Sequence, residues 1–241
     1  GRELGFRQAA APVVAFTDDD CVQSVTWLAA GLRALGERRA IVVGCTMPNP
    51  DQAANRGQFS RTLQVRNTLY FQTCNIFYRL ADLEAVGGFD AGFDKPGGED
   101  TDLALRMIDE LGVEAVFAEE ALVYHDISPS DFRACVRVAN RWTGVARLIA
   151  KHPSTRKTFL YQRVFWKITH QRVLLAWLGL VGAIFDARTL VLVVPWLWYR
   201  ARKRQSGLRV RPHAVPGRFI IDTVEVVTMI RGSVRERTFI L

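Results

Sequence analysis

The sequence is poor in cysteine, with four among its 241 residues, at positions 21, 45, 74 and 135. They form neither a CxxC pair nor the spacing of a zinc-binding module. This excludes a disulfide-stapled fold and a structural zinc site, and we expect reduced, mostly buried thiols in a cytosolic chain. Internal repeats and low-complexity tracts are also missing from the sequence.

Three other absences narrow the function classes. The sequence contains no P-loop or other glycine-rich phosphate motif, so a phosphoryl-transfer enzyme has no support. Its two longest apolar runs, residues 173–185 and 189–199, are both shorter than the ~20 residues that span a bilayer. The pI of about 9.7 raises a nucleic-acid-binding alternative. That alternative ranks last, because the aromatic residues lie inside apolar runs and not among lysines and arginines on a polar surface.

Charge divides the chain into two unequal parts. Residues 1–140 carry 13 Lys and Arg against 20 Asp and Glu, a net charge of −7, whereas residues 141–241 carry 19 against 4, a net charge of +15. The basic part also holds the apolar runs. Such asymmetry predicts an anionic surface as a partner of the C-terminal part.

An acidic triplet, Asp18 to Asp20, directly follows the apolar run 12–16, which predicts a short buried strand. Adjacent carboxylates repel one another and raise one another's pKa. A divalent cation would relieve this repulsion, because hard ions prefer oxygen ligands. The triplet therefore indicates a metal site at the end of a strand, and a solvated acidic turn is the alternative.

A second acidic cluster and a histidine follow further along. Glu99, Asp100 and Asp102 stand after Gly97 and Gly98, at the start of a segment with helical spacing. Helix capping explains one of these acids but not the crowding of all three. His125 is the first polar residue after a predicted strand end at 121–124, and imidazole is a common ligand of ions such as Mn²⁺.

Together these segments resemble the family 2 glycosyltransferases of GT-A fold. The resemblance extends from about residue 2 to about residue 150, and it is carried by the segments 16–21 (FTDDDC), 27–28 (WL), 74–79 (CNIFYR), 86–90 (VGGFD), 98–106 (GEDTDLALR) and His125. The acidic triplet alone is a weak signal, whereas the pair GGFD and EDxDL at this spacing is specific. Residues 218–241 resemble, less specifically, the C-terminal tails of some bacterial members.

The resemblance implies a donor side of the site. Asp18 and Asp20 correspond to the outer acids of the family's Asp-x-Asp motif, which bind a divalent ion, Mg²⁺ or Mn²⁺, that bridges the diphosphate of a nucleotide-sugar. His125 matches a further metal ligand, which favours Mn²⁺ slightly. Asp19 would support this site or contact the nucleotide. Two more residues, Asn75 and Arg79, match positions near the donor sugar or structural positions beside it.

The resemblance also implies an acceptor side. Asp100 corresponds to the general base that deprotonates the acceptor hydroxyl, and Glu99 would orient it or hold the acceptor. Asp102 is a further acceptor-binding candidate. Arg137 and Arg141, in the helix predicted from residue 131, would lie near the acceptor or the diphosphate, with a solvated helix surface as the alternative. A base and a metal on opposite sides of the sugar favour one in-line displacement with inversion of the anomeric configuration.

We therefore predict an α/β fold, a partial GT-A (Rossmann-like) mixed sheet flanked by helices, in residues 1–150. Family members begin with further strands that hold the nucleobase, and residues 1–7 match the segment just before the Asp-x-Asp strand. The resemblance thus implies that the N-terminal nucleotide-binding strands are lacking, as in a fragment or a truncated product. In that case the chain is a transferase, a non-catalytic, membrane-associated scaffold, or an inactive fragment of such an enzyme.

Residues 151–241 are predicted to form a helical, apolar and basic appendage. Trp177, Trp196 and Trp198 lie within its apolar runs, and Lys and Arg flank them. This pattern suits a helical pair in the membrane interface, with a pair of core helices as the alternative. We expect a peripheral protein on the cytoplasmic, inner face of a bacterial cell membrane. It would use a nucleotide-sugar donor and a glycan or lipid-linked acceptor in cell-wall or surface polysaccharide synthesis, and no nucleic acid.

Overall fold

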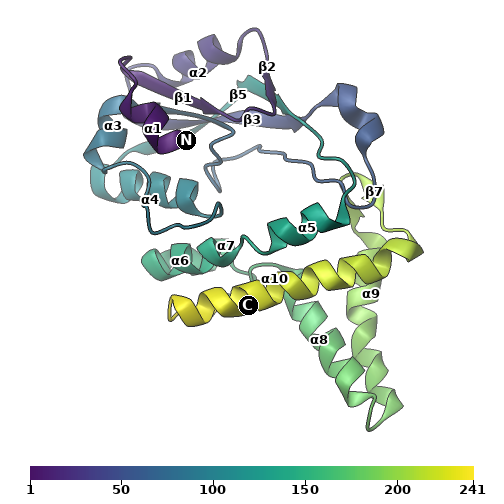
Figure 1. Cartoon of the computed structure of the whole chain (residues 1–241). Coiled ribbons are helices and arrows are strands. Elements are labelled where there is room, and N and C mark those ends of the chain that lie inside the picture. The colour runs from purple at the N-terminus through teal and green to yellow at the C-terminus, as the bar shows by residue number, and fades with distance from the viewer. The chain divides into compact units, whose positions relative to one another are not determined.

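A computed structural model describes residues 1–241 apart from the side chain of Gln205. The chain forms two compact units, which are considered separately (Figure 1). The first unit comprises residues 1–55, 62–94 and 98–128. The second comprises residues 56–61, 95–97 and 129–241.

The first unit is built on a mixed five-stranded sheet. Its strand order is β1 (Val13–Thr17), β4 (Asn75–Arg79), β3 (Ala40–Pro48), β5 (Glu114–His125) and β2 (Cys21–Gln23). Strands β3 and β5 are parallel, and the other neighbours are antiparallel. Because β2 pairs with the end of β5, Cys21 lies opposite His125, and the turn after β1 is brought to the same edge. The predicted α/β class is confirmed.

Helices cover both faces of this sheet. The helical elements of the first unit are α1 (Arg2–Arg7), α2 (Trp27–Leu35), η1 (Pro50–Asn55), α3 (Leu80–Ala85) and α4 (Glu99–Leu111). Side chains alternate along β3: Ile41 and Val43 pack in the core with α3 and α4, whereas Val42 packs in the core with α2. All three are fully buried. This explains the uninterrupted apolar run, since a strand covered on both faces needs no polar side.

The second unit is helical. Its main helices are α5 (Phe132–Ala139), α6 (Thr143–Lys151), α8 (Ile168–Gly182), α9 (Val194–Arg202) and α10 (Val215–Arg235). Shorter elements connect them, namely η2 (Pro153–Thr155), α7 (Arg156–Phe159), η3 (Ala187–Val193), β6 (Arg204–Gln205), β7 (Leu208–Arg209) and η4 (Pro212–Ala214). Helix α10 packs against α5, α6 and α8 (Figure 1). Among the described residues, no helix has the length and apolarity needed to cross a bilayer.

Two boundaries differ from the sequence prediction. The division between the units falls after Ser128 and not near residue 150, because α5 and α6 pack against α10 of the second unit. The helix predicted from residue 131 is interrupted between Ala139 and Thr143. Asn140 ends α5, where its side chain Nδ2 donates to the carbonyl of Val136 at 3.1 Å.

Candidate active site

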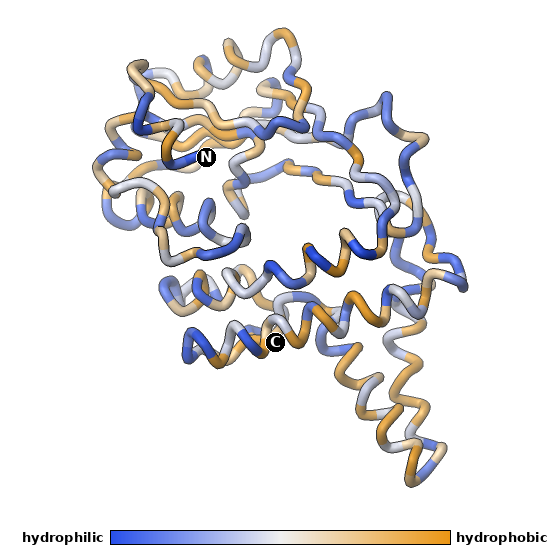
Figure 2. The backbone as a smooth tube through the Cα atoms, viewed as in Figure 1, coloured by the Kyte–Doolittle hydropathy of each residue, from blue (hydrophilic) through white to orange (hydrophobic). Residues whose placement is uncertain are grey.

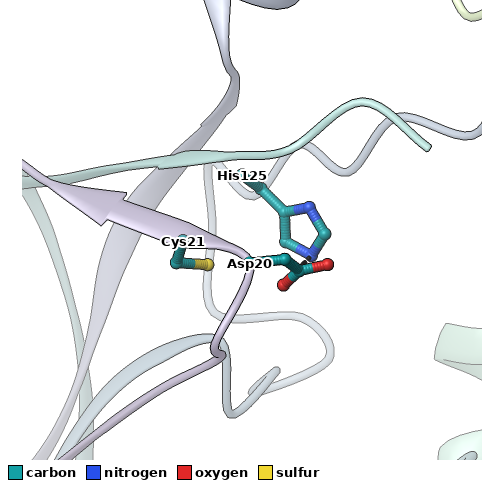
Figure 3. A group of neighbouring side chains, drawn as sticks. All are labelled: Asp20, Cys21 and His125. Atoms are coloured by element: carbon teal, nitrogen blue, oxygen red, sulfur yellow. Dashed lines mark ion pairs between the residues drawn. The ribbon is translucent and has the colours of Figure 1, made fainter. Parts of the chain in front are cut away.

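The acidic triplet forms the turn between β1 and β2. The amide of Cys21 donates to the carbonyl of Asp18 at 3.2 Å, which closes the turn. The β2–β5 pairing then places Asp20 beside His125, with 3.4 Å between Oδ1 and Nε2. Figure 3 shows Asp20, Cys21 and His125 together, and one ligand atom from each lies within 4.8 Å of the others. The predicted association of the triplet with His125 is therefore present.

These groups fit a hard divalent cation. Burial, followed by repulsion from Asp20 and Asp19, raises the pKa of Asp18 above its usual range, while His125 and Arg2 lower it. A bound cation would offset that repulsion. His125 Nδ1 lies 2.9 Å from the carbonyl oxygen of Asp126, which makes Nδ1 the donor and leaves the Nε2 lone pair on the Asp20 side.

Cys21 was not predicted as a member of this group. Burial raises the pKa of its thiol to about 11, so the sulfur stays protonated at neutral pH. Hard divalent ions prefer oxygen and imidazole nitrogen to sulfur as ligands. Carboxylate oxygen and imidazole nitrogen remain as the donor set, which suits Mg²⁺ or Mn²⁺. Asp18 lies within electrostatic reach of Asp20 and His125, and its own role as a ligand stays a prediction.

The second acidic cluster forms the first turn of α4. Gly98 precedes the helix with φ of 111°, a conformation that only glycine adopts easily. Asp100 Oδ1 accepts from the amide of Thr101 at 3.0 Å. Burial first, and then repulsion from Glu99, raise the pKa of Asp100 to about 7, although Arg2 and backbone hydrogen bonds lower it. A carboxyl group with such a pKa exchanges a proton readily near neutral pH.

Asp102 has a different environment from its neighbours. Its side chain is fully buried and accepts from Arg106 Nε at 3.0 Å. Arg106 also donates to the carbonyls of Val86 and Gly88, each at 2.6 Å. Asp102 thus fixes the glycine turn after α3 to the start of α4. Asp102 therefore has a structural role here, and its part in acceptor binding stays a prediction.

Arg2 joins the two acidic clusters, and sequence reasoning did not single it out. Its guanidinium pairs with Glu99 and donates to Thr73 Oγ1. The same charge lowers the pKa of both Asp18 and Asp100. Arg2 is therefore held at the start of α4 by Glu99 and lies within electrostatic range of the turn after β1. Arg2 and Glu99 are 97 residues apart in the sequence, and no local pattern links them.

The sheet beneath this site carries two groups that were also not predicted. Cys74 is buried, and burial together with Asp18 and Asp100 raises its pKa to about 12. Tyr78 is fully buried, and burial and Asp100 raise its pKa well above the usual range. Its hydroxyl has no hydrogen-bond partner within the described part of the chain. Asp100 therefore lies within electrostatic range of both Cys74 and Tyr78, and Asp18 lies within range of Cys74.

Asn75 proves to be a structural residue. The β3–β5 register shifts between Gly44 and Cys45, which leaves carbonyls without ladder partners. Asn75 Nδ2 donates to the carbonyls of Cys45 and Ala121 at 2.9 and 2.8 Å. Its Oδ1 accepts from Trp27 Nε1 at 2.8 Å. With three hydrogen bonds made by its amide and only 1% of the residue exposed, Asn75 fits the structural alternative, and its place near the donor sugar stays a prediction.

Arg79 lies at the end of β4 that is far from the acidic turn. It pairs with Val13 at the start of β1, whereas Asn75 pairs with Thr17 beside the acidic turn. Four residues of strand separate the two positions by ~13 Å. Arg79 instead donates to the carbonyls of Arg38 and Gly36 at 2.9 and 2.7 Å, where it supports the loop after α2.

The predicted roles of three other residues, Asp19, Arg137 and Arg141, stay predictions. Asp19 is exposed in the turn and raises the pKa of Asp18. Arg137 lies on α5 of the second unit, with its Nη2 3.7 Å from Asp131 Oδ2, and Arg141 follows the end of the same helix. Their contacts within that unit neither support nor contradict a part in acceptor binding.

A family model described as "Glycosyl transferase family group 2" matches residues 16–216, more than half of the chain. Among curated proteins, validoxylamine A glucosyltransferases of Streptomyces hygroscopicus, from subsp. jinggangensis (strain 5008) and subsp. limoneus, are each 25% identical over 208 residues. The matches cover 71% of this chain and 47% and 44% of those proteins. The chain thus spans about half the length of these curated relatives.

Solved structures also match at low sequence identity. A mannosyltransferase, PcManGT, from Pyrobaculum calidifontis, in complex with GDP-Man and Mn²⁺, matches with a TM-score of 0.47 at 17% identity over 97% of this chain and 64% of that one. GalNAc-T7 with UDP, GalNAc and Mn²⁺ matches with a TM-score of 0.42 at 14% identity over 63% of this chain and 36% of that one.

Proposed function

The chain belongs to glycosyl transferase family group 2, and from that premise we propose that it catalyses the inverting, divalent-metal-dependent transfer of a sugar from a nucleotide-sugar to an acceptor hydroxyl. The observation that carries the proposal is the pairing of β2 with β5, which places Asp20 Oδ1 3.4 Å from His125 Nε2 in the turn that also holds Asp18, while Arg2 pairs with Glu99 beside Asp100. One site then holds a carboxylate cluster suited to a metal ion and a carboxyl group suited to proton transfer.

The donor side would be formed by the turn after β1. Asp18, Asp20 and His125 would hold Mg²⁺ or Mn²⁺, with Asp19 at the nucleotide. Such an ion supplies Lewis-acid stabilisation of the negative charge that develops on the departing diphosphate, worth several kcal/mol. His125 contributes a fixed tautomer, because its Nδ1 is held by the Asp126 carbonyl.

On the acceptor side, Asp100 would take the proton from the attacking hydroxyl. A pKa of about 7 keeps much of its carboxylate ionised at neutral pH while leaving it basic enough to accept a proton. A positioned base of this kind contributes ~10²–10⁴-fold to the rate. Glu99 is buried against Arg2, so it would orient Arg2 and Asp100 and would not take part in proton transfer.

We propose inversion because the base and the ion site come from separate elements of the fold. The base stands at the first turn of α4, and the ion site stands at the turn between β1 and β2. An acceptor activated by the base and a diphosphate held at the ion would occupy opposite faces of the sugar ring. A single displacement then inverts the anomeric carbon, by the same opposite-face logic as in inverting glycosidases.

The acceptor would be a glycan or a lipid-linked sugar in bacterial cell-wall or surface polysaccharide synthesis. Arg137 and Arg141 are the candidates for contacts with it. We place the protein at the cytoplasmic face of the cell membrane, and the support for this is the basic, apolar composition of residues 141–241.

The test is a donor-turnover assay with a panel of UDP-, GDP- and dTDP-sugars, including glucose donors because the curated relatives are named glucosyltransferases. Release of nucleoside diphosphate should need Mn²⁺ or Mg²⁺ and should disappear in Asp20→Asn. A Glu119→Gln, Glu120→Gln variant, which removes two exposed acids of β5 from the same unit, should keep it. Proton NMR of the product should show the inverted anomer. Turnover that is insensitive to chelators or to Asp20→Asn would contradict the proposal.

A further inference from the structure

A helical hairpin extends from the second unit. Helix α8 forms one arm, and η3 followed by α9 forms the other, as Figure 1 shows. The arms pack closely because Gly179 and Gly182 face Thr189: an added Cβ would lie 2.8 Å from the Thr189 carbonyl oxygen or from its Oγ1. Thr189 Oγ1 also donates to the Gly179 carbonyl at 3.0 Å. The hairpin is therefore a close-packed element with a defined outer surface.

That outer surface is apolar. At the tip, Ile184 is 77% exposed and Phe185 is 88% exposed. Nine further large apolar side chains are exposed along the two arms: Trp177, Leu178, Leu180, Val181, Leu190, Val191, Val194, Leu197 and Trp198. Figure 2 shows hydrophobic colour along both arms. A continuous apolar surface of this kind marks an interaction site in a soluble protein.

Helix α8 has no polar face along most of its length. Its buried stripe, Val173, Ala176 and Gly179, faces the protein, and the opposite side carries Leu178 and Val181. Residues 173–185 contain no charged side chain. A helix that is apolar all round belongs in a core or in lipid. Only one side of α8 is packed, so the other side requires an apolar partner.

The charge of the hairpin identifies the class of partner. Residues 167–204 contain seven Lys and Arg against one acid, Asp186. Lys167 and Arg200 pair with Glu225 and Asp222 of α10, so five cations and one acid remain, a net charge of +4. Several of these cations lie over aromatic rings near the base of the arms. Arg172 lies 4.3 Å from the Tyr199 ring centroid, and Arg202 lies 4.1 Å from that of Trp198. Aromatic rings and cations side by side are typical of the headgroup level of a membrane.

We propose that this hairpin docks in the interfacial layer of an anionic phospholipid bilayer, with its arms lying along the membrane plane. The 15-residue α8 is ~22 Å long, shorter than the ~30 Å hydrocarbon core. Upright insertion would also bury the exposed Asp186 and Arg188 at the tip. Lying flat, the hairpin sinks its apolar side chains ~5–10 Å and keeps both charges among the headgroups.

The experiment measures binding of the full chain to vesicles of phosphatidylcholine with and without phosphatidylglycerol. The tip variant is Ile184→Ser, Phe185→Ser. Its control is Val234→Ser, Phe239→Ser, which removes apolar side chains of the same unit that are 74% and 64% exposed outside the hairpin. The tip variant should lose about tenfold or more in partitioning, and the control should bind like the parent. Arg202→Gln, Lys203→Gln should lose a similar factor on anionic vesicles only.

Two further measurements test the depth of the hairpin in the bilayer and the self-association of the protein. Tryptophan emission should be quenched more by lipids brominated near the headgroup than by lipids brominated near the chain ends. No vesicle binding by the folded parent, or equal binding by the tip and control variants, would overturn the proposal. A parent protein that is dimeric and does not bind lipid, together with a tip variant that is monomeric, would overturn the proposal in favour of a second copy of the chain as the partner. These readouts use neither donor nor metal, so they are independent of sugar transfer.

Discussion

Replacing Asp100 by Asn is expected to slow sugar transfer and to stabilise the protein at the same time. The amide is close in shape to the carboxyl group, and its oxygen can still accept from the Thr101 amide. The variant loses the proton acceptor, so turnover should fall by ~10²–10⁴-fold. It also loses a negative charge whose burial is unfavourable, which is the source of the stabilisation.

The sign of the pH dependence follows from the direction of the shift. The pKa of Asp100 rises from 3.8 to about 7 in the folded state. The folded state therefore holds the proton more tightly, and its stability falls as pH rises from about 4 to about 7. A shift of about three units corresponds to ~4 kcal/mol at ~1.36 kcal/mol per unit. Because Asp100 is partly exposed to water, we expect about 2 kcal/mol.

The assay is urea unfolding of the parent and Asp100→Asn at about pH 4 and about pH 8. The two proteins should have similar free energies of unfolding at the lower pH, and Asn should be more stable at the higher pH. Glu99→Gln is the matched control in the same helical turn. It weakens the pair with Arg2, so it should reduce stability. An Asp100→Asn protein that is no more stable at pH 8 than the parent, or that turns over normally, would refute the reasoning.

Three further changes test the structural roles assigned around the site. Arg106→Leu leaves Asp102 buried without its partner and should lower the free energy of unfolding in urea by ~3–5 kcal/mol. A decrease below about 1 kcal/mol would show that this pair does not hold the turn in place. Gly44→Ala would place a Cβ 2.3 Å from Asn75 Oδ1 and should reduce stability by ~1–3 kcal/mol. The variant should have a lower melting temperature, and an unchanged melting temperature would contradict the close packing of Gly44 against Asn75. His125→Ala should weaken Mn²⁺ binding by at least about tenfold in calorimetry, and unaltered affinity would exclude His125 as a ligand.

Features with a local pattern could be predicted from the sequence. The apolar run 12–16 was predicted to form a buried strand that ends at the acidic triplet, and β1 is observed there. The acidic clusters were also visible, because three like charges after an apolar run are locally unfavourable. The pairing of β2 with β5 then brings Asp20 to His125, as the resemblance implied.

Features that depend on long-range contacts could not be predicted. Asn75 is polar and lies near the site end of β4, but its amide fills the register shift between β3 and β5, which no periodicity reveals. Arg79 lies on the same strand and at its opposite end. The distinction between Asp100 and Asp102 arises from burial against Arg106. Likewise, Arg2 reaches Glu99 only after the chain has folded.

The most direct test of the central claim is a calorimetric titration of nucleotide-sugars into the full chain with Mn²⁺. We predict saturable binding of one donor class that requires the metal, is lost in Asp18→Ala, Asp20→Ala, and is retained in Asp100→Asn, because the base acts on the acceptor. Binding that needs neither the metal nor the two acids, or no binding to any donor by the folded protein, would contradict the assignment of this site to sugar transfer.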